Sequence, residues 1–300
     1  MHTTARPVKR KYIVFIIALI AVVGAVVLMV RTMKRRVNYT QEELQSLWDN
    51  ASYYDVFTKS GILLETYPLD PYLLTLRGFS AYQLAIAQIN SSDMLTFIDS
   101  SIWSLRKALL IKNDNAAEYV LGKAYYYKGQ SFADLAVKFL EQASSGGSNA
   151  PDIPEFLGIL YAQLRDFKKS TAAFSQSLNI TRNAEYSSDR VLLSIARSYL
   201  ELEEWDSAQN YLNRCIDISK DSNAISRAHF LLGTIFEKTG DAARASGHFL
   251  AAIEIGGENA DAHYHLGEVY AAQDIAKARA EWRRALQIDP GHQQARERIN

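Results

Sequence analysis

Apolar residues recur every three or four positions along almost the whole chain after residue 39. This spacing matches one face of an α-helix, and no run alternates apolar and polar residues for long enough to indicate a β-strand. The few prolines of this region fall between the helical stretches, where they do not interrupt a helix. The pattern therefore predicts that residues 39–300 are all helical.

One segment departs from this amphipathic pattern. Residues 12–30, YIVFIIALIAVVGAVVLMV, carry no charged side chain, and as a helix they would be about 28 Å long, close to the hydrocarbon thickness of a bilayer. A cleavable signal peptide would have a shorter apolar run of about 7 to 15 residues, followed by a small-x-small cleavage site. Here the run is longer and continues into the basic stretch RTMKRR. We therefore expect a transmembrane helix at 12–30, a short basic tail at 1–11 and a basic juxtamembrane linker at 31–38.

Charge is divided unevenly along the chain. The first 36 residues contain eight lysines and arginines and no acidic residue, so the other 264 residues hold 25 basic and 33 acidic groups, a formal charge of −8. An acidic body argues against a nucleic-acid partner, because such binding requires basic side chains that neutralise phosphates. Four basic residues lie on each side of 12–30, so the Lys/Arg bias that orients membrane helices is tied. The compact KRK at 9–11 gives a slight preference for an extracytoplasmic body, and RTMKRR favours the opposite placement.

A small residue, usually glycine, returns at intervals of 34 to 44 residues within a common short pattern. Instances are RGFSAY (77–82), LGKAYY (121–126), LGILYA (157–162), IARSYL (195–200), LGTIFE (232–237) and LGEVYA (266–271). Self-similarity at this period indicates an array of helical hairpins, in which the small residue lets two helices approach closely and the aromatic residue fills the space between neighbours. The chain therefore reads as a repeat protein.

These residues resemble the tetratricopeptide repeat (TPR), a 34-residue helix-turn-helix with Leu-Gly-x-x-Tyr in its first helix and Ala-x-x-x-Phe-x-x-Ala in its second. The resemblance implies repeats at 71–110, 115–149, 151–184, 189–222, 226–259 and 260–293, a degenerate helical pair at 39–70 and a cap or tail at 294–300. The copies at 226–259 and 260–293 match best, and 151–184 departs by placing Ser170 and Ser177 where small alanines are usual. The expected fold class is all-α: a TPR-type α-solenoid, a right-handed superhelix of helical hairpins, preceded by one transmembrane helix.

The side chains that could carry chemistry have structural interpretations. His229 and His263 occupy the fourth position of their repeats, where a large side chain packs against the second helix, and His248 is expected at the surface. His265 points roughly 200° away from His263 around the helix, so the two cannot share a metal ion. Cys215 occupies a small-residue packing position. With no phosphate-binding glycine loop and no nucleophile elbow, the sequence predicts no catalytic residue, no metal or other cofactor and no small-molecule substrate, and we expect a protein that is not an enzyme.

The resemblance also implies where partners bind. In this family the concave face is drawn largely from positions 2, 5, 9 and 12 of the first helix of each repeat. Carried onto this sequence, those positions give the expected partner-binding residues Tyr119, Lys123, Tyr126, Arg190, Arg197, Arg227, Phe230, Tyr264 and Glu268, with Leu193 in the same row. Aromatic residues among arginines and lysines suit a peptide that carries apolar and acidic groups. The alternative is that some of them merely cover the groove or pack between repeats. The Lys/Asn pattern of repeat proteins that bind chaperone C-termini is absent.

The expected function is therefore that of a membrane-anchored scaffold or assembly factor, which holds partner proteins or peptides in a groove close to the bilayer. The layout is similar to that of bacterial inner-membrane repeat proteins that assist envelope biogenesis, secretion or pilus assembly, and this likeness rests on architecture alone. An alternative is a regulatory subunit of a membrane enzyme or of a secretion or envelope-biogenesis complex. Such a subunit would contact its partner through AVVGAVV, where Gly24 permits close helix approach.

Overall fold

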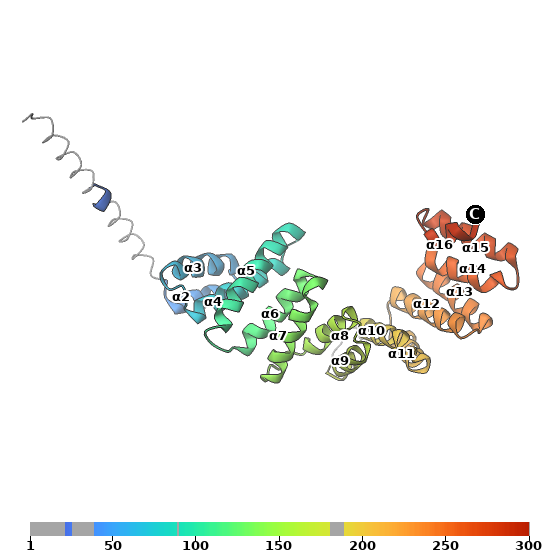
Figure 1. Ribbon diagram of the computed structural model, residues 1–300, viewed down its shortest axis with the longest axis horizontal. Helices are drawn as coiled ribbons and strands as arrows, with labels where there is room; N and C mark the ends of the chain where they lie inside the picture. Colours follow the sequence, from blue (N-terminus) through green and yellow to red (C-terminus); the bar gives the residue numbers. More distant parts are fainter. Residues whose placement is uncertain (1–21, 26–38, 89, 181–188, 300) are drawn as a thin grey trace, which may run out of the picture. The chain divides into compact units, whose positions relative to one another are not determined.

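The computed structural model describes residues 22–25, 39–88, 90–180 and 189–299 (Figure 1). In these ranges all regular structure is helical and no strand is present, so the all-α prediction is confirmed. The predicted span at 12–30 and its basic flanks at 1–11 and 31–38 lie outside the described residues, apart from 22–25, which are helical and exposed. Among the described residues, no helix combines the length and the apolar character that crossing a membrane requires. The chain divides into two compact units, residues 1–113 and 114–300, called here the N-terminal and C-terminal units.

Among the described residues from 39 onward, the N-terminal unit is built of the helices α2 (Gln41–Asp49), α3 (Tyr53–Thr66), α4 (Pro71–Ile86) and α5 (Ser91–Leu109). Each packs against the next along the chain, and the α4–α5 hairpin makes the most extensive contacts. Helix α4 begins where Asp70 accepts a hydrogen bond from the backbone N–H of Leu73 and a proline occupies the first helical position, a combination that favours helix initiation. The loop YPLDP thus ends one helix and starts the next.

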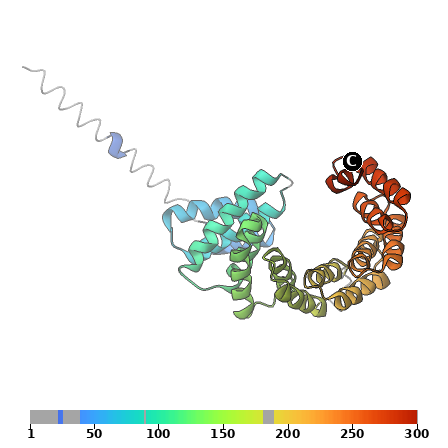
Figure 2. The same cartoon turned by 45° about the vertical axis from the view of Figure 1, so that its right-hand side comes forward.

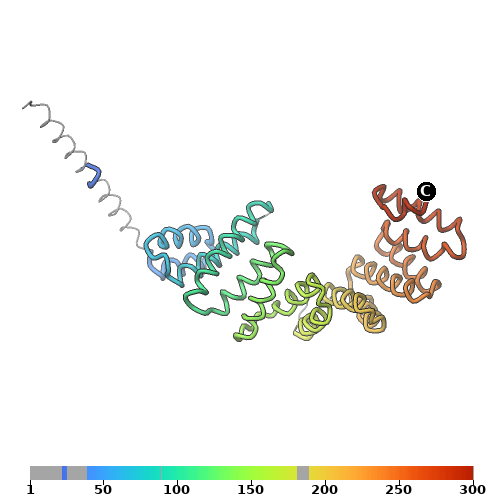
Figure 3. Tube along the Cα trace, in the orientation of Figure 1, coloured from blue at the N-terminus to red at the C-terminus, as the bar shows by residue number. Residues whose placement is uncertain are grey.

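The C-terminal unit is a stack of helical hairpins. Its elements are α6 (Asn115–Lys128), the 3₁₀ turn η1 (Gln130–Phe132), α7 (Ala133–Ser145), α8 (Ile153–Gln163), α9 (Phe167–Ile180), α10 (Asp189–Glu201), α11 (Trp205–Ile218), α12 (Ser222–Lys238), α13 (Ala242–Gly256), α14 (Ala260–Ala271), α15 (Ile275–Ile288) and α16 (Gln293–Ile299). Figures 1 and 3 show that each helix lies beside the next in chain order. A continuous core runs from α10 to α14 and includes Leu212, Leu232, Phe249 and Leu266.

The stack has two layers of helices, and the helices of one layer are packed more closely together than those of the other. The first helices α6, α8, α10, α12 and α14 contact one another directly, whereas consecutive second helices have few or no such contacts between described residues. Because the layer of first helices is the more closely packed, the stack curves toward it. Figure 2 shows the helices of the C-terminal unit following an arc. The layer of first helices is called here the inner layer.

Glycine in the first helix of a hairpin makes the two helices fit together. A Cβ atom added at Gly158 or Gly233 would lie 2.6 Å from the nearest atom of the Phe174 or Phe249 ring. The same relation joins Gly78 to Leu105, Gly122 to Leu140 and Gly267 to Trp282, at 2.5, 2.7 and 2.5 Å. These distances are shorter than any real Cβ contact, so each large side chain of the second helix occupies the space that a glycine leaves empty.

The repeat that departs from the usual alanines compensates with hydrogen bonds. Ser170 is buried in α9 and donates a 2.8 Å hydrogen bond to the carbonyl oxygen of Gly158. Its Oγ also lies 2.9 Å from the Oγ of Ser198 in α10. A buried hydroxyl is tolerated because it has partners, and here the partners lie on both neighbouring helices.

The C-terminal end of the stack is covered by α16. Ala295 of this helix is fully buried in a small core with Ala278, Trp282 and Ala285 of α15. Helix α16 begins where the backbone N–H of Ala295 donates a 3.1 Å hydrogen bond to Nδ1 of His292. The last short segment of the chain therefore packs on the preceding hairpin as a helix.

Replacing Gly233 by alanine tests the packing role of these glycines. The added methyl group must displace the Phe249 ring, and overpacking of this kind costs about 1–3 kcal/mol. The matched control is Gly247→Ala, an exposed helical position in α13 whose new Cβ would meet nothing within 4 Å, where we expect a gain of roughly 0.5–1 kcal/mol. Urea unfolding of the full-length protein measures both. Equal effects of the two substitutions would contradict the packing role.

Candidate functional site

The nine residues expected to bind partners all lie on first helices of the C-terminal unit, namely α6, α10, α12 and α14. They therefore belong to the inner layer. Four contacts between neighbouring first helices show what these side chains do within the molecule.

At the step from α6 to α8, Tyr119 and Lys123 both bind Asp152. The Tyr119 hydroxyl donates a 2.8 Å hydrogen bond to the carboxylate, and the Lys123 ammonium forms a 2.8 Å ion pair with it. The ammonium also lies 4.9 Å from the centroids of the Tyr119 and Phe156 rings. Burial is the main reason that the pKa of Tyr119 is raised, so the phenol stays protonated and donating. These two residues tie α6 to the start of α8.

At the step from α8 to α10, the guanidinium of Arg190 pairs with the carboxylate of Glu155. The arginine side chain is largely exposed and the glutamate largely covered. Beside this pair, Tyr126 packs edge-on against Phe156 with ring centroids 4.9 Å apart. Burial raises the pKa of Tyr126. Ring and ion pair together join the first three inner helices.

At the step from α12 to α14, Nδ1 of His265 lies 2.8 Å from the carboxylate of Glu237. The ring of Phe230 lies 5.7 Å from the His265 ring and 5.8 Å from the Phe249 ring. Phe230 is half-buried, so one part of the ring packs in the stack and another part faces solvent.

At the step from α14 to α16, the guanidinium of Arg298 binds both carboxylate oxygens of Glu268, with Nε donating at 2.8 Å. The ring of Tyr264 lies 5.1 Å from the ring of His292. Burial, followed by the charge of Glu268, raises the pKa of Tyr264. These residues hold the terminal helix in place.

Arg197 of α10 and Arg227 of α12 differ from the other charged residues of the row. Both are exposed, and neither makes an ion pair or a hydrogen bond to any residue that the structure describes. Partial burial, and then the charge of Arg227, lower the pKa of Arg197. Buried Leu193 precedes Arg197 by one helical turn, and Phe230 follows Arg227 by one turn. These positions bring two cations and an aromatic ring onto one stretch of the inner layer.

The contacts involve acidic residues that were not among the expected site residues. Asp152, Glu155 and Glu237 stand at positions 2, 5 and 12 of their repeats, so the rule that selected the other residues would have selected them too. The expected set consists of aromatic and basic residues, with Glu268 as its single acid. Each acid supplies the partner of a basic or aromatic residue on the neighbouring first helix.

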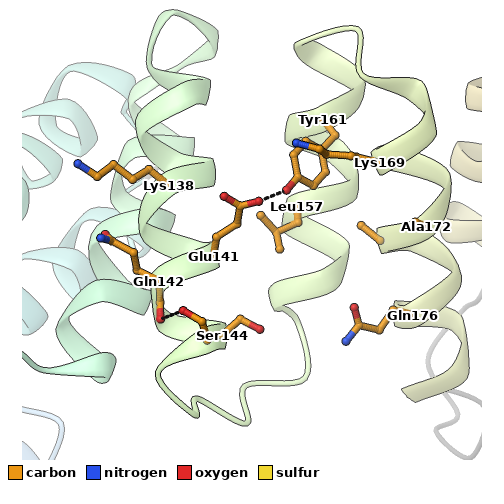
Figure 4. A pocket seen from close by; sticks show the side chains of 11 residues that line it. Lys138, Glu141, Gln142, Ser144, Leu157, Tyr161, Lys169, Ala172 and Gln176 are labelled. Carbon is orange, nitrogen blue, oxygen red and sulfur yellow. Dashed lines mark hydrogen bonds between the residues drawn. The ribbon is translucent and has the colours of Figure 1, made fainter.

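A separate surface pocket of 620 Å³ lies between α7 and the α8–α9 hairpin and was not anticipated from the sequence. Figure 4 shows Glu141 and Tyr161 pointing toward each other across it, joined by a hydrogen bond from the tyrosine hydroxyl. Burial and this hydrogen bond raise the pKa of Tyr161. Lys169 lies 5.2 Å from the centre of the Tyr161 ring. The polar groups in the middle of the pocket therefore already satisfy one another.

The histidines pack within hairpins. Nδ1 of His229 lies 3.0 Å from Nδ1 of His248, whose ring stacks on Phe236 at 5.3 Å. The expectation that His248 is a surface residue is wrong: it is half-buried, because it reaches across the hairpin to His229. His263 binds Glu281 at 2.6 Å on the opposite side of the helix from His265. Across the described ranges, no three His, Cys, Asp or Glu residues are grouped so that they could hold a metal ion.

Cys215 is fully buried in α11. Burial, together with the negative charges of Asp189 and Asp221, raises the pKa of its thiol to about 11. The thiolate is the reactive form, so this cysteine is a poor nucleophile at neutral pH.

Comparison with known proteins agrees with this architecture. The family model described as tetratricopeptide repeat matches residues 193–260 and 230–293. The C-terminal part of a TPR repeat-containing protein from Cytophaga hutchinsonii is similar in structure, with a TM-score of 0.60 and 16% identity over 86% of this chain and 99% of that one. Pseudomonas aeruginosa pilF gives a TM-score of 0.53 at 15% identity, over 73% of this chain and 95% of the other.

MamA from Desulfovibrio magneticus RS-1, residues 41 to the end, gives a TM-score of 0.51 at 18% identity, over 60% of this chain and 98% of the other. At these identities the likeness concerns the fold alone. No curated protein is significantly similar in sequence. The repeat family expected from the glycine and aromatic spacing is confirmed.

The His229–His248 contact predicts a pH dependence of stability. A hydrogen bond between two imidazoles requires at least one neutral ring, and burial lowers the pKa of both histidines below the unfolded value of about 6.5. For basic groups shifted in this direction, the stabilisation is present above the unfolded pKa and is lost as the pH falls below it, because the unfolded state binds more protons. We expect the unfolding free energy to fall between pH 7.5 and 5 by more in the wild type than in the double variant H229Q/H248Q. Identical slopes in urea titrations would contradict this.

Proposed function

We propose that this chain, a tetratricopeptide-repeat protein, is a non-catalytic scaffold that holds a segment of another protein against the inner layer of its C-terminal unit. The TPR fold suggests interaction with proteins or peptides. The observation that carries the specific proposal is the stretch of α10 and α12 where Arg197 and Arg227 are exposed beside half-buried Phe230. It is the part of the inner layer whose charged groups are not used by the described contacts between repeats.

Recognition on this surface would come from side chains, because backbone groups within helices are already hydrogen-bonded to one another. An aromatic ring supplies contact area at small conformational cost, and a guanidinium supplies several directed hydrogen bonds. Arg227, Phe230, Thr234 and Glu237 follow one another at intervals of three or four residues along α12, so they share one face of the helix. A bound segment would run across this face toward α10.

Catalysis is not part of the proposal. The residues that could act as nucleophiles or bases serve packing instead: the Cys215 thiol is buried with a raised pKa, and His263 and His265 each contact a glutamate. The raised pKa of Tyr161 follows from burial and its bond to Glu141. These arrangements favour a protein that binds partners without transforming them.

The membrane tether remains a prediction from the apolar run at 12–30. An anchor would confine the scaffold to a thin layer next to the bilayer and raise its effective concentration toward membrane-associated partners. We propose a single-pass protein of a bacterial inner membrane, with a slight preference for an extracytoplasmic body. Contact through the tether itself, around Gly24, is the competing route by which such a protein could join a membrane complex.

Site-specific photocrosslinking in cells tests the groove. A photoreactive phenylalanine at Thr234, a partly covered position of α12, should crosslink the partner, and one at Ala243, an exposed position on second helix α13, should not. Blocking the groove with Thr234→Trp should reduce partner recovery at least tenfold, because one misplaced large side chain excludes a well-packed segment. The matched control is Ala243→Trp.

Equal crosslinking at the two positions, or unchanged recovery with Thr234→Trp, would exclude the groove. The variant Gly24→Leu separates the competing route, since it alters the predicted tether and leaves the hairpin stack intact. Loss of association in that variant alone would identify the transmembrane segment as the contact.

A further inference from the structure

Acidic and basic side chains contact each other across most steps of the inner layer. Such contacts are present at the steps from α6 to α8, from α8 to α10, from α12 to α14 and from α14 to α16, and the repeat positions that they use differ from step to step. The contacts are Lys123 with Asp152, Arg190 with Glu155, His265 with Glu237 and Arg298 with Glu268. Three of these contacts are ion pairs, and in the remaining one Nδ1 of His265 lies 2.8 Å from the carboxylate of Glu237; the series of four contacts is called here the ladder.

The step from α10 to α12 has no contact of this kind between the residues that the structure describes. Arg197 and Arg227 occupy positions 9 and 2 of consecutive repeats, as Lys123 and Asp152 do at the step from α6 to α8. There the equivalent positions hold opposite charges 2.8 Å apart. Here they hold two positive charges, and no described residue supplies a counter-charge to either. At the step from α10 to α12, the described residues thus include two arginines and no acidic partner for them.

Two guanidinium groups in this position repel each other and stay charged, because arginine does not lose its proton at physiological pH. Although Arg197 is exposed, desolvation of the covered part of its side chain and then the charge of Arg227 lower its pKa. An anion placed between the two groups would accept hydrogen bonds from both and remove the repulsion. The other four steps show which anion the ladder uses: an aspartate or glutamate carboxylate.

Resting on the proposed function, we infer that Arg197 and Arg227 form a binding site for an aspartate or glutamate side chain of the partner segment, with Phe230 contacting an apolar side chain next to it. The partner would thus supply the carboxylate that the step from α10 to α12 lacks. Phe230 lies one turn from Arg227 on the same face of α12 and is half-buried, so it can contact a second side chain of the same segment. The partner is an acidic peptide segment of a protein.

Charge balance favours this occupant over free phosphate or nucleic acid. The body of the chain carries a formal charge of −8, which repels polyanions at a distance. A local pair of arginines on a body of net negative charge selects a short segment that can place one or two carboxylates between them. Selectivity then comes from position as well as from charge.

A random dodecapeptide display library, selected on the full-length protein, tests the inference. We expect the enriched peptides to contain an aspartate or glutamate next to a leucine, isoleucine, valine, phenylalanine or tyrosine. A synthetic copy of an enriched peptide should bind at least tenfold more weakly to R197Q and to R227Q, the loss typical of a charge-assisted hydrogen-bonded pair. Replacing its acidic residue by the corresponding amide should weaken binding to the wild type to the same degree and have little effect on binding to the variants.

The matched control is R279Q, which removes an exposed arginine of the second helix α15, outside the inner layer. We expect it to retain peptide binding within twofold. Thermal unfolding checks the fold of each variant: R227Q should unfold at the same or a higher temperature than the wild type, because it removes a repulsion between like charges. Reduced binding in that variant would therefore reflect the lost site.

The outcomes separate the inference from the proposed function. Peptides that bind, lose binding with Thr234→Trp and show no acidic preference would overturn the carboxylate site and leave the groove intact. Acidic peptides that bind R197Q and R227Q as well as the wild type would do the same. Competition by millimolar inorganic phosphate, without acidic enrichment in the library, would identify a phosphate site instead. A library that yields no binder would overturn both proposals.

Discussion

The structure depends on the close approach of two helices within each hairpin, made possible by a missing side chain. Gly158 and Phe174 show the relation in one repeat, and Gly233 and Phe249 in another: the large ring occupies the volume that a Cβ atom would need. The helices of a hairpin can then share one core, and neighbouring hairpins extend it. Because each unit buries its apolar surface only against its neighbours, stability is built locally and repeated along the chain.

Once the hairpins are formed, polar contacts determine which side chains of the inner layer are joined to the neighbouring helix. The first helices lie close enough for side chains of consecutive repeats to touch, and ion pairs join them from Lys123 and Asp152 at one end of the C-terminal unit to Glu268 and Arg298 at the other. Exposed ion pairs contribute little to stability individually. Their main effect here is to determine which charged side chains of the inner layer are already paired and which are available to a partner. The stretch around Arg197 and Arg227 stands out against that background.

The fold could be predicted from the sequence because its determinants are periodic. Gly122, Gly158, Gly233 and Gly267 recur at near-constant spacing, and the helical pattern around them leaves no alternative to a hairpin array. The candidate site could be predicted only in part. Repeat position indicates the face on which a side chain lies, but not its partner on the next repeat, 29 to 35 residues away for Lys123 or Arg190. The same limit explains His248: its contact with His229, 19 residues away in the sequence, becomes visible only in the folded hairpin.

The way α16 closes the stack has a consequence for self-association. In a hairpin array, each hairpin presents an apolar surface on which the next hairpin packs. A hairpin whose surface is left uncovered can therefore bind another molecule there. Here Ala295 fills the position over Trp282 and Ala285, and Arg298 engages Glu268. Helix α16 covers this surface of the α14–α15 hairpin, so the apolar residues there are not available to seat a helix of another molecule.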